Sequence, residues 1–118
     1  MMNNENRIHK MTLSSVYPLY VKKAAKAGRT KEDVDTIILW LTGYSEQKLL
    51  FHIDQNTDFE NFFNQAPGIN PNASKITGSI CGIRVEEIED RIIQLVRYLD
   101  KLVDELAKGK AIAKILRK

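Results

Sequence analysis

Apolar residues recur at intervals of three and four along most of the chain, which is the spacing of one buried face of an α-helix. Four residues form the first such face: Tyr17, Tyr20, Val21 and Ala24. Ser15 is a suitable cap before this face, and Gly28 is a suitable stop after it. We therefore predict a helix over residues 15–27.

The second predicted helix has the clearest signals at both ends. Thr30 is its cap, and Asp33 completes a short form of the capping box. The buried stripe consists of Val34, Ile37, Ile38 and Leu41. Gly43 ends the helix, which we expect to be central to the fold.

Two shorter helices are predicted next. Ser45 caps the first of them. Thr57 and Glu60 are spaced as a full capping box for the second, which carries three phenylalanines. Pro67 and Gly68 stop it.

The last long element carries a strict heptad pattern, with spacings of 4, 3, 4, 3 and 4. Its members are Ile88, Ile92, Leu95, Leu99, Leu102 and Leu106. The pattern predicts a helix from about residue 85 to Lys108. Asp90 could instead cap a helix that begins at Arg91, with residues 85–89 as a turn or short strand. A short basic helix is expected to follow over 111–117.

These elements predict a mainly α fold: a single helical domain of about six helices, over residues 1–118, with a long C-terminal helix. Residues 1–12 are expected to be a disordered arm. Residues 73–83 fit either a helix or a strand, since Gly78 and Gly82 weaken both. The alternative is therefore an α+β fold with a small two-stranded piece within residues 75–88.

Composition narrows the class of protein. The chain has 118 residues, of which 43% are hydrophobic and 28% charged, as in ordinary globular domains. The longest apolar run, 37–41, is far too short to cross a bilayer, so we expect no membrane partner. Cys81 is the single cysteine and the N-terminus has no apolar signal segment, so a cytoplasmic location is expected.

The net charge of +3 is the sum of positively and negatively charged segments. Residues 1–31 sum to +6, residues 32–60 to −6 and residues 107–118 to +5. Such segments can pack on one another or on a second copy, or a basic surface can face a polyanion. A basic surface that faces a polyanion implies an alternative function, a nucleic-acid accessory protein that uses its basic ends. The bases that would contact phosphates are Lys108, Lys110, Lys114, Arg117 and Lys118.

Cys81 is the candidate for chemistry, because small neighbours leave space beside its thiol. A third possible function is therefore a small ligand-binding protein or enzyme around Cys81. The polar residues expected to line that pocket are Tyr44, His52, Arg84 and Tyr98. A buried structural thiol is the more common role for a lone cysteine. We assign no catalytic residue, no metal site and no cofactor, and an enzyme is not favoured.

The narrow heptad stripe favours a paired helix, because a bundle helix usually buries a wider face. The candidate self-association seam is Ile92, Leu95, Leu99 and Leu102. The alternative is that these residues pack on their own chain. The leading functional hypothesis is a non-catalytic interaction or oligomerisation module that assembles as a homo-oligomer.

Several stretches together resemble one known family. They are 15–21 (SVYPLYV), 28–30 (GRT), 40–44 (WLTGY), 58–59, 65–67, 76–78, 81–86 (CGIRVE) and 98–110 (YLDKLVDELAKGK). As a set they resemble the bacterial domain-of-unknown-function family 2200 (DUF2200) over nearly the whole chain. The resemblance implies no activity, cofactor or catalytic residue, so no functional residue is carried over.

Overall fold

The computed structural model describes residues 4–80 and 82–117. In chain order its helices and strands are α1 (Asn4–Lys10), α2 (Leu13–Ala25), α3 (Lys31–Thr42), α4 (Glu46–Asp54), α5 (Phe59–Asn64), β1 (Ser79–Ile80), β2 (Ile83–Arg84), α6 (Arg91–Ala107) and α7 (Ile112–Ile115). Short 3₁₀ turns cover Pro71–Lys75 and Val85–Glu87. The mainly α prediction is confirmed, and the small antiparallel pair of the alternative is present as well.

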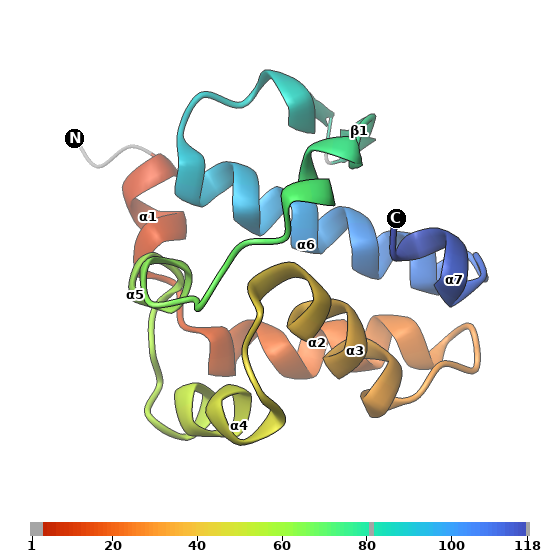
Figure 1. The fold of residues 1–118 in the computed structure, drawn as a ribbon, viewed down its shortest axis with the longest axis horizontal. Coiled ribbons are helices and arrows are strands. Elements are labelled where there is room, and N and C mark those ends of the chain that lie inside the picture. Colours follow the sequence, from red (N-terminus) through yellow and green to blue (C-terminus); the bar gives the residue numbers. More distant parts are fainter. Residues whose placement is uncertain (1–3, 81, 118) are drawn as a thin grey trace.

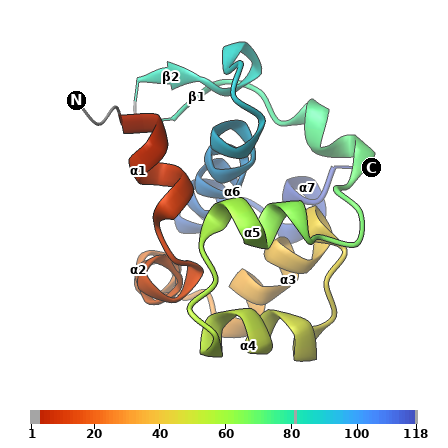
Figure 2. The same ribbon diagram turned by 90° about the vertical axis from the view of Figure 1, so that its left-hand side faces the viewer.

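Helix α6 lies at the centre of the packing. It contacts α1, α2, α3, α5 and α7 as well as the hairpin, and Figures 1 and 2 show these elements arranged around it. The hairpin lies at one side of the molecule and α4 at the opposite side in both views. Among the described residues, none of the helices is long and apolar enough to cross a membrane.

The predicted seam on α6 is buried inside the chain itself. Ile92, Leu95, Leu99 and Leu102 are all in the core, with Leu99 and Leu102 fully covered. The buried face is also wider than the heptad stripe, because it includes Ile93, Val96, Val103 and Leu106. This is the packing that the sequence left as the alternative to a seam between copies.

Three helix ends, both ends of α3 and the start of α6, lie where the local sequence patterns predicted them. Thr30 and Asp33 form the predicted capping box of α3. Gly43 ends α3 with a φ of 77°, and a side chain there would meet the Gly68 carbonyl oxygen at 3.0 Å. Asp90 caps α6, so the later of the two predicted starts for this helix is confirmed.

The start of α5 differs from the prediction. Its cap is Asp58, whose carboxylate accepts from the Asn61 backbone N–H at 2.8 Å. The hydroxyl of Thr57 instead forms a hydrogen bond of 2.9 Å with Nδ1 of His52. The spacing of Thr57 and Glu60 alone could not show this hydrogen bond, since His52 lies on the preceding helix.

The start of the chain also differs from the prediction. Within the segment expected to be disordered, residues Asn4–Lys10 form α1, which packs on α5 and α6. Thr12 then caps α2, so that helix begins at Leu13, before the predicted Ser15. The backbone N–H of Phe59 donates to the carbonyl of Met11 at 2.9 Å, which fixes the link between α1 and α2.

Candidate functional site

A surface cavity of about 380 Å³ opens between α1, the hairpin and the start of α6. We call it the isoleucine groove, and it is lined by Ile8, Ile83, Ile88, Ile93, Glu89, Asp90 and Arg97. Its volume falls within the range of pockets that bind ligands or partner side chains. The groove combines an apolar floor with charged groups at its edge.

The isoleucines of the groove differ in exposure. Ile93 is buried and Ile8 and Ile88 are partly covered, whereas Ile83 on β2 remains 42% exposed. Arg97 is fixed by an ion pair of 3.0 Å to Asp100. The exposed isoleucine is therefore a projecting apolar side chain beside an apolar hollow.

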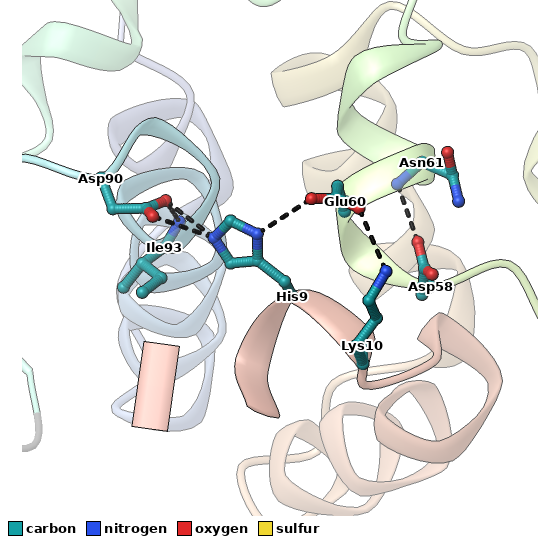
Figure 3. Close-up of polar contacts among 7 residues, drawn as sticks. All are labelled: His9, Lys10, Asp58, Glu60, Asn61, Asp90 and Ile93. Atoms are coloured by element: carbon teal, nitrogen blue, oxygen red, sulfur yellow. Dashed lines mark hydrogen bonds and ion pairs between the residues drawn. The ribbon is translucent and has the colours of Figure 1, made fainter. Parts of the chain in front are cut away.

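His9 holds the α1 wall of this groove in place (Figure 3). Its Nε2 lies 3.0 Å from both carboxylate oxygens of Asp90, and its Nδ1 lies 3.2 Å from Oε1 of Glu60. A carboxylate only accepts, so both ring nitrogens donate and the imidazole is in its charged form. His9 therefore joins α1 to α5 and α6, directly beside Ile8.

The pKa values in this cluster favour the charged state of every member. Burial acts to lower the pKa of His9, but the hydrogen bonds to Glu60 and then Asp90 outweigh it and raise that pKa. The pKa of Glu60 is lowered by His9 first and by Lys10 second, whose amino group lies at 3.3 Å. The pKa of Asp90 is lowered mainly by the Ile93 backbone N–H that it caps.

The chemistry open to this cluster is limited by its geometry. The two carboxylates lie on opposite nitrogens of the His9 ring and cannot converge on one ion. Across the described residues, no group of three or more His, Cys, Asp or Glu could hold a metal. Both nitrogens of His9 are occupied by carboxylates, so neither is left to activate a hydroxyl or a thiol. The contacts of His9 with Glu60 and Asp90 hold α1 against α5 and the start of α6.

Two of the residues predicted to line a pocket around the thiol come together in the core. The rings of Tyr44 and His52 lie 5.0 Å apart, and both are buried. The Tyr44 hydroxyl donates to the carbonyl of Phe62, and burial raises the pKa of Tyr44 to about 12. Burial, with a smaller effect of Lys48, lowers the pKa of His52. These groups are satisfied core residues.

The other members of that candidate pocket lie elsewhere. Arg84 is exposed on the hairpin and pairs with Glu86 at 3.3 Å, whereas His52 is on α4 at the opposite side of the molecule (Figures 1 and 2). Tyr98 is buried on α6. Cys81 lies outside the described residues, so its role stays a prediction. The structure does not bring Arg84 and His52 to one site.

The comparisons with known proteins identify a family and a close structural relative. The family pattern described as "Uncharacterized protein conserved in bacteria (DUF2200)" matches residues 7–117. The crystal structure of uncharacterized protein SP1917 superposes with a TM-score of 0.88 at 40% sequence identity, over 98% of this chain and 93% of that chain. A search of curated proteins found no match. The match over nearly the whole chain confirms the resemblance read from the sequence, and the protein belongs to the DUF2200 family.

Proposed function

We propose that this protein is a non-catalytic interaction module that pairs with a second copy of itself through the isoleucine groove. The observation that carries the proposal is the exposed Ile83 beside the groove. It replaces the seam on α6 as the contact surface, because those side chains are already buried within one chain.

A two-fold dimer needs a surface that is complementary to itself. The isoleucine groove can meet this requirement, because its lining includes the exposed Ile83 as well as the more covered Ile8, Ile88 and Ile93. In a two-fold pair, Ile83 of each copy would enter the groove of the other. Burying the exposed part of two isoleucines supplies the apolar contribution.

The charges around the groove are also mixed in a self-complementary way. Arg84 and Arg91 are exposed on one part of the hairpin end, and Glu87 and Glu89 are exposed close to them in the chain. A two-fold axis can place the arginines of one copy opposite the glutamates of the other, which favours pairing in one orientation. We expect micromolar affinity, as for interfaces below the standard size of about 800 Å² per partner.

The test is the molar mass in solution. Sedimentation equilibrium at about 100 μM protein should give mostly twice the 13.5 kDa of one chain, because a Kd of about 10 μM leaves few monomers there. Ile83→Asp should give the monomer mass, because it places an unpaired carboxylate in the contact. Leu19→Asp is the matched control, since Leu19 is 61% exposed on α2 away from the groove; it should remain dimeric.

Two results would overturn the proposal. One is a wild-type mass of a single chain at that concentration. The other is a dimer that Ile83→Asp and Leu19→Asp affect equally. A single cysteine fits a reducing compartment, so we place the dimer in the cytoplasm as part of the same proposal.

A further inference from the structure

The end of the molecule opposite the start of α6 gathers cations from two segments that are distant in sequence, residues 22–31 and residues 107–117. Lys23 of α2 and Lys108 both pair with Asp104, at 3.3 and 2.9 Å. Lys110 and Arg117 both pair with Glu105, at 3.4 and 2.7 Å. The guanidinium of Arg29 donates to the carbonyl of Lys110, which brings the loop after α2 against the loop after α6. In Figure 1 the end of α2, the end of α6 and α7 lie together on the right.

We call these five cations (Lys23, Arg29, Lys108, Lys110 and Arg117) the basic end. Five positive charges around two carboxylates leave three positive charges in excess. The side chains of Asp104 and Glu105 are only 16% and 11% exposed, whereas that of Lys108 is 72% exposed. The side chains of Lys23 and Lys110 are 45% and 40% exposed, whereas that of Arg117 is only 15% exposed. An approaching partner therefore meets the lysine ammonium groups before the two carboxylates.

Further lysines extend this surface along the same elements. Lys22 and Lys26 are exposed at the end of α2, and Lys114 is exposed on α7 between Lys110 and Arg117 in sequence. The eight cations named here outnumber Asp104 and Glu105 by six, which exceeds the +3 of the whole chain. Such an uneven field attracts a polyanion whatever the net charge.

We propose that the basic end binds the phosphate backbone of double-stranded DNA without reading its sequence. Phosphate contacts by lysine and arginine are sufficient for binding of this kind. The cations are fixed on helix ends and short loops by the ion pairs described above.

Two other anionic partners fit the surface less well. Single-stranded nucleic acid is held by aromatic side chains on which bases stack, and residues 22–31 and 107–117 contain none. A lipid surface is held by apolar side chains that enter it together with the bases. The large exposed apolar residues of the described chain are Met11, Leu19, Leu50, Phe51 and Ile83, and none of them lies in those two segments.

The experiment measures fluorescence anisotropy of a labelled DNA duplex of about 20 base pairs at about 50 mM salt, followed by a salt titration. Wild-type protein should bind at micromolar concentration, with an affinity that falls steeply as salt rises. Lys108→Gln/Lys110→Gln should weaken binding about tenfold and lower the salt slope by about two, one per lost phosphate contact. Lys22→Gln/Lys26→Gln tests the surface without touching the ion pairs of Asp104 and Glu105, and it should also weaken binding.

The control is Lys10→Gln/Lys48→Gln, which removes the same charge from exposed lysines on other elements and should bind as wild type does. The proposal is overturned if the duplex does not bind at micromolar protein, or if the control weakens binding as much as both variants of the basic end. Tighter binding of a single strand, or of vesicles containing anionic lipid, than of the duplex would overturn it as well.

Discussion

The two ends of α6 are each fastened by a terminal segment of the chain, but the fastening chemistry differs. At its start, His9 of α1 binds Asp90, the residue that caps the helix. Near its end, Arg117 binds Glu105 through two hydrogen bonds, Nη1 to Oε1 at 2.9 Å and Nη2 to Oε2 at 2.7 Å. Both contacts join a charged base to a carboxylate, and both hold a terminal segment of the chain against α6.

The difference lies in which partner can lose its charge. The guanidinium of Arg117 stays charged at any pH at which the protein is folded. The imidazole of His9 titrates near neutrality, although its pKa is raised here. The C-terminal attachment is therefore permanent in physiological conditions, whereas the attachment of α1 is conditional. Ile8, one wall of the groove, belongs to the conditional part.

The largest effect should follow from breaking the permanent attachment. Arg117→Ala leaves the carboxylate of Glu105, which is only 11% exposed, without its bidentate partner. We expect the free energy of unfolding to fall by about 2 kcal/mol, because the covered carboxylate keeps only its longer contact to Lys110, at 3.4 Å. Urea unfolding followed by circular dichroism measures this change.

Glu105→Leu/Arg117→Leu is the matched control for that change. It removes both charges together, so it should lose clearly less stability than Arg117→Ala. If Arg117→Ala costs less than about 1 kcal/mol, the pair behaves as an exposed surface pair and the contrast between the two ends fails.

A smaller effect is expected from the cap at the other end. Asp90→Ala removes the bond to the Ile93 backbone N–H at 3.0 Å and also the partner of His9. Loss of a cap alone costs about 1 kcal/mol. Asp58→Ala is the matched control, because Asp58 caps α5 but is not a partner of His9 (Figure 3). Urea unfolding should show that Asp90→Ala costs more than Asp58→Ala at pH 6.

The comparison between these two caps becomes sharper when the pH is raised. As the pH rises from 6 through the raised pKa of His9, the imidazole loses its charge, so the difference in cost between the two substitutions should shrink. If the difference in cost between Asp90→Ala and Asp58→Ala does not change with pH, His9 does not contribute to the stability of the start of α6.

The sequence predicted the fold well wherever the deciding contacts are local. The capping box of Thr30 and Asp33 and the glycine stop at Gly43 depend on neighbours in the chain, and both are present. The heptad stripe of α6 correctly marked buried residues, but not what they pack against. Ile93 and Val96 widen the buried face, and only the positions of α2 and α3 decide whether that face meets the same chain.

The candidate site could not be predicted in the same way. His9 binds residues that lie 51 and 81 positions away in the sequence, and no spacing pattern relates them. The isoleucine groove likewise joins α1, β2 and α6. Arg84 and His52 were grouped as polar side chains that could line a pocket beside Cys81. Such grouping carries no information about distance, and the fold places them on opposite sides (Figures 1 and 2).

The smallest expected effect is local and concerns the attachment of α1. The folded-state pKa of His9 lies above its ordinary value of 6.5, so its contribution to stability is complete below 6.5 and is lost as the pH rises through the raised value. The pKa values of Glu60 and Asp90 lie below 4.5 and 3.8, so their contribution is present above those values and is lost as the pH falls. The attachment is therefore strongest in mildly acidic solution. Amide hydrogen exchange of α1, corrected for the intrinsic rate, should show protection that decreases from pH 6 to pH 8. The protection of α7 should stay constant, because the contact that holds it involves no histidine. His9→Gln should remove the pH dependence in α1, since a neutral amide has no charge to lose.

Protection of α1 that decreases equally in wild type and His9→Gln would mean that another group controls this end. The distinction between a conditional and a permanent attachment would then no longer hold.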